Sequence, residues 1–491
     1  MEEREDTKME NLGSELEKMR EYFRSGKTRE ASWRVAQLKG LLKFLKEREE
    51  DIFKAVMEDL GKHHVEAYRD EVGPLIKSIV FALKCLKGWM SGKKAPLPKV
   101  ALLTSGEVVP QPIGLVLLIP SWNFPIGLSV EPMIGAIAAG NTVVLKPSEL
   151  APASSSLLAN CMTTYLDSEA IKVIEGGPAI GEQLLQHRWD KIFFTGSERV
   201  GRIVMSAAIK HLTPVILELG AKCPCVVDCL SSFDKIAAVN RIVGAKYGSC
   251  AGQACIGVDY VLVEKRYAPI LVEEVKNRIK QMFGDNPIES HSISRIVNKK
   301  HFMRLRNLLK EEAVQESIIY GGSMDEANLY IEPTVLLDPP LDATIMTEEI
   351  FGPLLPIITL EKIEDSINFI NLRPKPLAIY AFTKNESLKR KLLVETTSGS
   401  LVFNDAIIQY VANTIPFGGI GESGIGNYHG KYSFDAFSHY KGVVRRSFLV
   451  DFWFRFPPWN NYKLMLFEAT YVDDYIGMLL VILGLKKSRH N

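Results

Sequence analysis

From residue 113 onward, short apolar runs typical of β-strands alternate with stretches typical of helices. This alternation predicts a parallel sheet covered by helices, and ligands of such sheets bind at the carboxyl ends of the strands. The first block has strand-like runs at 113–119, 142–145, 172–174, 191–194 and 215–217. A second α/β block has strand-like runs at 260–263, 330–337, 355–360, 377–382 and 401–403. Functional residues are therefore expected just after these strands.

The part of the chain before this alternation is predicted to contain helices and one β-ribbon. Residues 29–90 carry apolar stripes at helical spacing, for example Leu38, Leu41, Leu42 and Leu45. Residues 94–112 are predicted to form two extended segments with a turn at Ser105 and Gly106. Because a two-stranded ribbon is unstable alone, it must lie on something, and an arm between subunits is a natural use.

Size and charge restrict the class of protein. A chain of 491 residues, 46% of them hydrophobic, is long enough for two large domains. Its 59 basic and 58 acidic residues give a net charge of +1, which provides no electrostatic footprint for a nucleic acid. We therefore expect a small-molecule ligand and no nucleic-acid partner.

The seven cysteines include no CxxC pair and do not resemble a disulfide framework, so a reducing compartment is expected. Cys223, Cys225 and Cys229 have the spacing of a β-strand and its exit rather than of a zinc site, and no metal is expected. The acidic N-terminus shows no targeting signal. These features together favour a cytoplasmic protein.

The C-terminal tail ends in an apolar run, residues 475–485, followed by Lys486, Lys487 and Arg489. Spanning a bilayer takes about 20 residues, so this run is too short to cross one. It is expected to dock on the protein or to make peripheral contact with an intracellular membrane, and the aromatic residues of the tail fit either alternative.

Residues 247–256 contain mostly small side chains around Cys255, which leaves room for a substrate and a cofactor to approach a thiol. Cys255 is therefore a candidate nucleophile. The alternative is a tightly packed turn with Cys255 as a buried apolar residue. Cys250 is interpreted as a buried structural thiol, the alternative being a disulfide with Cys255 under oxidation.

Polar residues follow two of the predicted strands. Gly196 and Ser197 open a helix that continues through Gly201, and free N–H groups at such a helix start favour a phosphate. The GxGxxG fingerprint is absent, so these glycines can also serve the turn alone. Lys146 and Glu149 follow a different strand, where they can bind ribose hydroxyls or form a solvated pair.

Seven motifs in order resemble those of the NAD(P)-dependent aldehyde dehydrogenase superfamily, most closely its class 3 branch with the plant-type members. They are Pro-Ser-Trp-Asn-Phe-Pro at 120–125, Leu-Lys-Pro-Ser-Glu at 145–149, Phe-Thr-Gly-Ser at 194–197, Glu-Leu-Gly-Ala-Lys at 218–222, Gly-Gln-Ala-Cys at 252–255, Glu-Glu-Ile-Phe-Gly-Pro at 348–353 and Pro-Phe-Gly-Gly at 416–419. The match covers residues 29–445, and residues 428–438 carry the class 3 character.

The resemblance implies an α/β fold with a Rossmann-like NAD-binding domain (1–93 and 113–221) and an α/β catalytic domain (222–408). Residues 94–112 and 409–446 would be bridging or oligomerisation segments with a β-ribbon arm, and 447–491 the tail. It also implies a homodimer and medium- to long-chain or aromatic aldehydes as substrates.

The resemblance further implies a catalytic mechanism. Cys255 would attack the aldehyde, while the Asn123 side chain and the Cys255 backbone N–H would hold the oxyanion. Hydride would pass to the nicotinamide, and Glu218 would activate the water that hydrolyses the thioester.

Cofactor contacts are implied as well. Lys146 and Glu149 would bind the adenine ribose, Ser197 with the turn from Gly196 to Gly201 the pyrophosphate, and Glu349 with Phe351 the nicotinamide ribose and ring. Trp122 would wall the cofactor or substrate channel, or be a core aromatic. Because a carboxylate at Glu149 would repel a 2′-phosphate, NAD is favoured, with NADP as the alternative.

One residue departs from the family pattern, since Ala221 stands where a second glycine is usual. If this position requires a left-handed backbone, alanine costs roughly 1–2 kcal/mol and shifts Glu218. We expect activity to be retained. The sequence disfavours two alternative functions. The combination of Cys255, Glu218 and Asn123 disfavours a non-catalytic binding protein, and Lys146, Glu149 and Glu349 disfavour a cofactor-free thiol acyltransferase or amidase.

Overall fold

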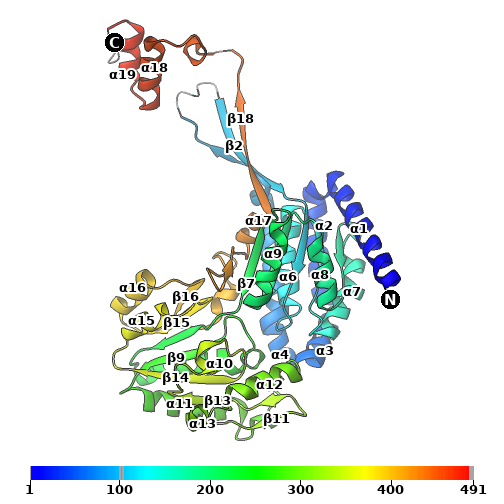
Figure 1. The fold of residues 1–491 in the computed structure, drawn as a ribbon, viewed down its shortest axis with the longest axis vertical. Helices are drawn as coiled ribbons and strands as arrows, with labels where there is room; N and C mark the ends of the chain where they lie inside the picture. Colours follow the sequence, from blue (N-terminus) through cyan, green and yellow to red (C-terminus); the bar gives the residue numbers. More distant parts are fainter. Residues whose placement is uncertain (1, 99–100, 102–103, 450, 486–491) are drawn as a thin grey trace. The chain divides into compact units, whose positions relative to one another are not determined.

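The computed structural model describes residues 2–98, 101, 104–449 and 451–485 (Figure 1). The chain divides into two units: residues 1–86 with 112–438, and residues 87–111 with 439–491.

A six-stranded sheet forms the first half of the larger unit. Its strands are β3 (Leu115–Ile119), β4 (Thr142–Leu145), β5 (Ile171–Val173), β6 (Lys191–Gly196), β7 (Val215–Leu219) and β17 (Gly424–Ile425). They lie in the order β17-β7-β6-β3-β4-β5, and every neighbouring pair is parallel except β17 with β7. The predicted parallel sheet is therefore confirmed.

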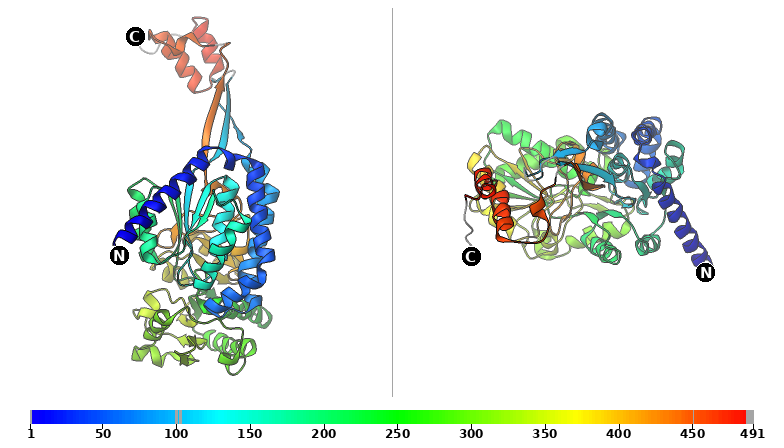
Figure 2. Two further views of the ribbon diagram at one scale, coloured as in Figure 1. Left: turned by 90° about the vertical axis from the view of Figure 1, so that its right-hand side faces the viewer. Right: turned by 90° about the horizontal axis from the view of Figure 1, so that it is seen from above.

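Helices cover both faces of this sheet, because side chains alternate along each buried strand. Leu115 and Leu117 belong to a core shared with α1 (Glu2–Arg24), α8 (Pro178–Gln186) and α9 (Glu198–Ile209). Figure 2 shows α1, in dark blue, crossing these strands diagonally. Val116 and Leu118 alternate with them, and α6 (Gly127–Ala139), which is buried along its whole length, also contacts β3 and β4.

The predicted N-terminal helices are confirmed. They are α2 (Ala31–Glu47), α3 (Glu49–Leu60), α4 (His64–Ala67), the π-helical turn η2 (Tyr68–Val72) and α5 (Gly73–Met90). Leu38, Leu41 and Leu45 are buried as their spacing predicts. Helices α2 and α3 pack on α7 (Pro152–Tyr165).

A seven-stranded sheet forms the second half of the larger unit, in the order β10-β13-β14-β9-β8-β15-β16. Its strands are β8 (Pro224–Val227), β9 (Tyr260–Glu264), β10 (Ile318–Tyr320), β13 (Thr334–Leu337), β14 (Leu354–Leu360), β15 (Ala378–Phe382) and β16 (Ser400–Phe403). Only β10 runs antiparallel to its neighbour. Its helices include α10 (Ser232–Tyr247), α11 (Ala268–Phe283), α12 (Lys299–Leu308), α15 (Asp365–Asn371) and α16 (Glu386–Glu395). The predicted α/β fold is thus confirmed in both blocks.

Three local predictions were wrong. The predicted strand 330–337 is two strands, β12 (Tyr330–Ile331) and β13. The first of them pairs with β11 (Met324–Asp325). The strand is interrupted because Pro333, between the two, has no N–H to donate to a neighbouring strand. The predicted turn at Ser105 and Gly106 lies inside β2 (Thr104–Pro112), where Gly106 pairs with Ala95. Strand β7 continues past its predicted end and contains Glu218.

The smaller unit contains the predicted ribbon, widened to three strands. β1 (Lys93–Ala95), β2 and β18 (Ser438–Arg446) form one sheet in that order. The tail contributes α18 (Asn461–Tyr471) and α19 (Tyr475–Ile482), which share a small core of Phe454, Met465, Leu466 and Val481.

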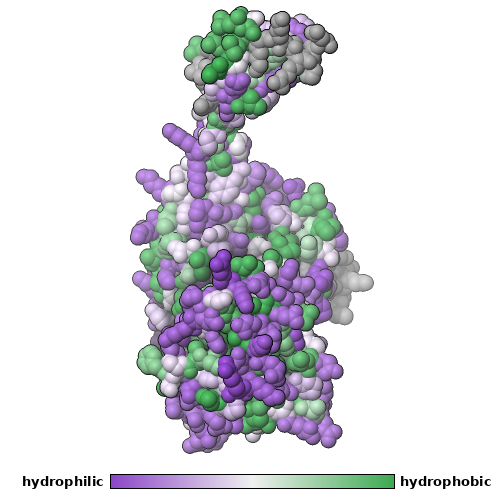
Figure 3. Space-filling view, turned by 90° about the vertical axis from the view of Figure 1, so that its left-hand side faces the viewer, coloured by the Kyte–Doolittle hydropathy of each residue, from purple (hydrophilic) through white to green (hydrophobic). Residues whose placement is uncertain are grey.

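Apolar side chains remain exposed on this helix pair, and Figure 3 shows them gathered in green over it. Among them are Ile476, Leu479, Ile482 and Leu483. Lys486, Lys487 and Arg489 lie outside the described residues. Within the described ranges, no helix combines the length and apolarity needed to cross a membrane.

Candidate active site

The residues predicted to follow strands meet at one edge of the six-stranded sheet. Parallel pairing places Ile119 beside Phe194, Leu118 beside Leu145, and Thr195 beside Glu218. The strand ends that lead to Asn123, Lys146 and Ser197 are therefore neighbours. Glu218 joins them from within strand β7, as its penultimate residue, rather than from the loop after it.

Cys255 and Glu218 are in direct contact. The Cys255 Sγ donates to Glu218 Oε1 at 3.0 Å. Glu218 is buried, and its other oxygen accepts from the Tyr428 hydroxyl at 2.6 Å and from the Thr195 hydroxyl at 3.5 Å. Cys255 itself is partly exposed. The structure thus places a partly exposed thiol in hydrogen-bond contact with the Glu218 carboxyl group. The hydrogen bonds from Tyr428 and Thr195 fix the position of that carboxyl group.

The protonation of this pair follows from its surroundings. Burial raises the pKa of Glu218, although its hydrogen bonds from Cys255, Tyr428 and Thr195 lower it. Burial, followed by the neighbouring Glu218 carboxylate, holds the pKa of Cys255 well above its usual range. The Cys255 thiol is therefore held in its neutral form, with its proton directed at the Glu218 carboxyl group.

The turn before Cys255 has an unusual backbone. Cys250, Ala251 and Gly252 have φ values of 49°, 49° and 77°, in the left-handed region that non-glycine residues rarely adopt. The Gln253 side chain stabilises this turn by donating to the Cys250 carbonyl at 2.9 Å and the Arg295 carbonyl at 2.9 Å. A Cβ at Gly252 would lie 2.4 Å from the Gly352 carbonyl oxygen. Backbone packing therefore requires the glycine here.

Cys250 is a fully buried free thiol, and Cys255 is also free. Burial raises the pKa of the Cys250 thiol to about 12. This environment fits the interpretation of Cys250 as a structural thiol.

Asn123 lies against the loop that carries Cys255. Its side chain is buried, and its Nδ2 donates to the Gln253 carbonyl at 3.0 Å. Its Oδ1 is buried without a hydrogen-bond partner among the described residues. The Asn123 side-chain amide is thus anchored to the backbone carbonyl of a residue two positions before Cys255.

Of the residues predicted to bind the adenosine half of a dinucleotide, two form an ion pair. Lys146 Nζ lies 2.6 Å from Glu149 Oε2, with Lys146 nearly buried and Glu149 partly exposed. Ser197 caps α9, and its hydroxyl accepts from the Val200 N–H at 3.5 Å.

The two predicted glycines beside Ser197 also serve packing. A Cβ at Gly201 would lie 2.7 Å from a Leu219 methyl group, and one at Gly196 would lie 2.6 Å from the Phe194 ring. Both glycines therefore have a structural requirement of their own, next to the helix start that suits a phosphate.

Glu349 provides a test of whether the site suits a cofactor. Its Oε1 is buried without a partner among the residues that the structure describes, and burial raises the pKa of this carboxyl to about 8. An unpartnered buried oxygen of this kind fits a ligand hydroxyl, such as that of a ribose.

The backbone after β7 shows why alanine is tolerated at position 221, where a second glycine is usual in the family. A Cβ at Gly220 would lie 2.0 Å from Glu349 Oε2, so this glycine is required. Ala221 is not among the residues with a positive φ in the described ranges. The strain considered for Ala221 is therefore not incurred.

Trp122 and Phe351 contact each other edge to face, with their ring centroids 5.5 Å apart. The ring of His301 also lies edge to face with Trp122, with a centroid distance of 5.2 Å. Trp122 is buried in an apolar cluster that also contains Leu60 and Cys250. Its burial fits the core-aromatic alternative as well as a channel wall.

Sequence reasoning assigned no role to several residues that hold the site. Tyr428 was noted only within a matching segment, yet its hydroxyl reaches Glu218 across 210 positions of sequence. Lys222 binds Asp259 and the carbonyls of Ile345 and Glu348, next to Glu349. A contact between segments far apart in the chain produces no periodic pattern in the sequence. Only the family motifs that contain or adjoin these residues could have pointed to them.

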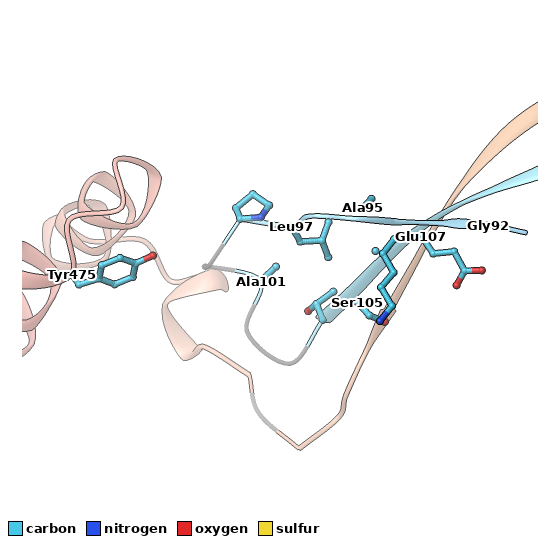
Figure 4. Close-up of a pocket in the computed structure, with 11 residues that line it drawn as sticks. Gly92, Ala95, Leu97, Ala101, Ser105, Glu107 and Tyr475 are labelled. Atoms are coloured by element: carbon cyan, nitrogen blue, oxygen red, sulfur yellow. The ribbon is translucent and has the colours of Figure 1, made fainter. Parts of the chain in front are cut away.

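A separate hollow lies within the smaller unit (Figure 4). It is lined by Lys94, Leu97, Glu107 and Tyr475, among others. None of its lining residues is a predicted site residue.

The aldehyde dehydrogenase family model matches residues 3–443. The chain belongs to the aldehyde dehydrogenase family. It is 54% identical to aldehyde dehydrogenase family 3 member F1 of Arabidopsis thaliana, covering 97% of this chain and 99% of that protein. The predicted class 3, plant-type resemblance is confirmed.

Two solved structures extend this comparison. The substrate-bound state of Staphylococcus aureus AldH is 39% identical, with a TM-score of 0.90 over 94% of this chain and 99% of that one. Glyceraldehyde-3-phosphate dehydrogenase GapN of Methanocaldococcus jannaschii, solved in complex with NADP, is 25% identical, with a TM-score of 0.79 over 89% of this chain and 95% of that one. The enzyme is an NAD(P)-dependent aldehyde dehydrogenase that oxidises aldehydes to acids.

Proposed function

We propose that Cys255 is the nucleophile of this oxidation and that Glu218 is its base. The observation that supports this assignment is the 3.0 Å contact between Cys255 Sγ and Glu218 Oε1. As sulfur bonds to the aldehyde carbon, the thiol proton passes to Glu218 along this contact. Because burial disfavours a free thiolate, transfer of the proton during the attack is favoured over forming the thiolate first.

The oxyanion formed by this attack needs donors nearby. We assign them to the Asn123 side-chain amide and the backbone N–H of Cys255. Asn123 Nδ2 already points at the Cys255 loop through its bond to the Gln253 carbonyl. Removing one such donor costs about 100- to 1,000-fold in rate in other enzymes.

Bound NAD(P)+ supplies the acceptor for the hydride that leaves the substrate carbon. The chain would hold it through Lys146 and Glu149 at the adenine ribose and Ser197, at the start of α9, at the pyrophosphate. Glu349 and Phe351 would hold the nicotinamide ribose and ring, with Trp122 beside Phe351. The Glu149 carboxylate favours NAD over NADP, because it would repel a 2′-phosphate.

Loss of hydride leaves a thioester on Cys255. Glu218 first releases the thiol proton to solvent and then, as a carboxylate, takes a proton from the water that attacks the thioester carbon. Collapse of this adduct breaks the C–S bond and releases the acid, and the proton held by Glu218 returns to the sulfur to restore the thiol. The hydrogen bonds from Tyr428 and Thr195 hold this carboxylate while its partner changes from thiol to water.

Other assignments follow the class 3 resemblance. We propose medium- to long-chain aliphatic or aromatic aldehydes as substrates, and a cytoplasmic homodimer in which the β1-β2-β18 ribbon is the oligomerisation arm. The cofactor domain would comprise 1–93 and 113–221, and the catalytic domain 222–408. Residues 94–112 and 409–446 would bridge them.

We also propose peripheral membrane contact through the tail, residues 447–491. The exposed apolar side chains of α19, together with the exposed rings of Trp453 and Trp459, support it.

The test is NADH formation with a panel of aliphatic and aromatic aldehydes, using the wild-type chain and Cys255→Ala. We expect aldehyde-dependent NADH from the wild type and none from the variant, because the covalent route is lost. Absence of any aldehyde-dependent signal, or equal activity in both proteins, would refute the assignment of Cys255.

A further inference from the structure

The short segment between α3 and α5 contacts both loops of the proposed reaction centre. It contains α4 and the π-helical turn η2, a rare geometry that is frequent at functional sites. One group of its side chains contacts the loop of residues 123–127, and another contacts residues 248–250.

Lys62 and Glu71 form an ion pair at the ends of this segment. Lys62 Nζ lies 2.9 Å from Glu71 Oε1, and both side chains have 0% exposure. The same ammonium donates to the Asn123 carbonyl at 2.6 Å and lies 3.9 Å from the centre of the Phe124 ring. Its charge is thus directed at the residue that carries the proposed oxyanion donor.

Glu71 binds the other side of the same loop. Its Oε2 accepts from the Ile126 N–H at 2.8 Å and from the Gly127 N–H at 3.1 Å. Between them, Lys62 and Glu71 satisfy one carbonyl and two amides of a five-residue loop. An ion pair needed only for stability can usually be replaced by apolar residues. Here both partners have hydrogen bonds to the loop that apolar residues cannot make.

The same segment holds the chain that leads to Cys255. Glu66 Oε1 accepts from the Cys250 N–H at 2.7 Å, and Asp70 Oδ2 accepts from the Ser249 hydroxyl at 3.0 Å. Arg69 donates to the Gly248 carbonyl at 2.6 Å. This one segment therefore connects the Asn123 loop with the turn before the nucleophile through its side-chain hydrogen bonds.

We propose that the buried Lys62–Glu71 pair is a positioning device that holds the Asn123 loop in register with the Cys255 loop and so sets the oxyanion site. Neither residue touches the substrate; both act through Asn123. The inference rests on the proposed role of Asn123 as an oxyanion donor. Its consequence is that the pair governs the rate of attack by Cys255 without governing cofactor binding.

The test compares two double variants with the same chemical change. Lys62→Met/Glu71→Gln removes both charges together, so that no unpaired charge stays buried. Lys235→Met/Glu274→Gln makes this change at an ion pair between α10 and α11, in which Nζ lies 2.9 Å from Oε1. This pair is not among the side chains that bond the loops of residues 123–127 and 248–250 in the described part of the chain. For each protein we would measure dehydrogenase kcat, KM for NAD+, and the first turnover of cofactor-free 4-nitrophenyl ester hydrolysis. In that first turnover, release of 4-nitrophenolate reports acylation of Cys255 before deacylation begins.

Because a displacement of about 1 Å in a site can cost about 100-fold in rate, we expect Lys62→Met/Glu71→Gln to slow ester hydrolysis by about 10- to 100-fold. KM for NAD+ should stay within about twofold, and the Lys235/Glu274 control should resemble the wild type in every assay. Unchanged ester hydrolysis in a folded Lys62/Glu71 variant would overturn the proposal. So would an equal loss in the control.

A second comparison identifies the route of the effect. If the pair acts through Asn123, then adding Asn123→Ala to the Lys62/Glu71 variant should cost much less than Asn123→Ala costs in the wild type. Losses that simply multiply would overturn positioning through Asn123 while leaving Asn123 as an oxyanion donor. No loss from Asn123→Ala in the wild type would instead remove the proposed donor, and the positioning role with it.

Glu71→Asp keeps the proposal testable if the double variant does not fold. It preserves the buried charge pair but shortens the reach by one methylene group, so the carboxylate cannot reach Lys62 and both amides together. We expect slower ester hydrolysis with unchanged KM for NAD+, after circular dichroism has shown a folded protein. Wild-type ester hydrolysis by this variant would refute the inference.

Discussion

Gly220 and Ala221 stand side by side after β7, and the structure predicts opposite consequences for changing them. A methyl group at Gly220 would lie 2.0 Å from Oε2 and 2.7 Å from Cδ of Glu349. Ordinary contacts between heavy atoms lie near 3.5–4.0 Å, so in Gly220→Ala the Glu349 carboxylate must move by about 1 Å or more. In Ala221→Gly no contact is introduced, and the backbone has no positive φ to relieve.

The magnitude follows from this displacement. A buried polar group that loses its partner costs about 1–3 kcal/mol, which corresponds to about 5- to 150-fold in binding. If Glu349 holds the nicotinamide ribose, Gly220→Ala should raise KM for NAD+ or lower kcat by a factor in this range. Ala221→Gly should keep both constants near the wild type and lower the free energy of unfolding by about 0.5–1 kcal/mol, through the greater entropy of the unfolded chain.

The assay is the initial rate of NADH formation at varied NAD+, with saturating aldehyde, for the wild type and the two variants. Cofactor-free ester hydrolysis serves as an internal control, because it does not need Glu349. Wild-type KM and kcat in Gly220→Ala would refute the reasoning, as would an equal loss in Ala221→Gly. A variant of Ala221 with much faster turnover would show that alanine impairs the site after all.

Two further predictions concern Glu218 and the tail. Tyr428→Phe removes a hydrogen bond that lowers the pKa of Glu218, so this pKa rises and the acidic limb of the pH dependence of kcat should move to higher pH; an unmoved limb would show that Glu218 does not control that limb. Deleting residues 474–491 removes the exposed apolar face of α19 and should shift the protein from membrane to supernatant in fractionation and vesicle sedimentation. Unchanged fractionation would assign the tail to packing.

The alternation of strand-like and helical segments was sufficient to predict both parallel sheets. The reason is that strands buried on both faces are read directly from short apolar runs, as at Thr142–Leu145, where every residue is buried. The prediction failed where a run of suitable residues is interrupted by local chemistry. Pro333 separates two strands that belong to different sheets, and periodicity alone does not detect a single missing N–H donor.

The sequence also predicted where the chemistry should lie, because residues after parallel strands share one edge of the sheet. This rule pointed to the segments that contain Asn123, Lys146 and Ser197, and the motifs pointed to Cys255 and Glu218 as candidate site residues. What a residue touches across the fold was not predictable. Tyr428 approaches Glu218 because the antiparallel pairing of β17 with β7 brings this part of the chain alongside β7.

The sequence by itself determined the fold class, the family and the identity of the candidate nucleophile, base and amide, because these depend on residue type and local order. Only the tertiary structure decided which glycine is indispensable, that Cys255 donates to Glu218, and that Lys62 and Glu71 hold the Asn123 loop. Each of these is a distance of a few ångströms between segments far apart in the chain. Packing sets such distances, and local patterns carry no record of them.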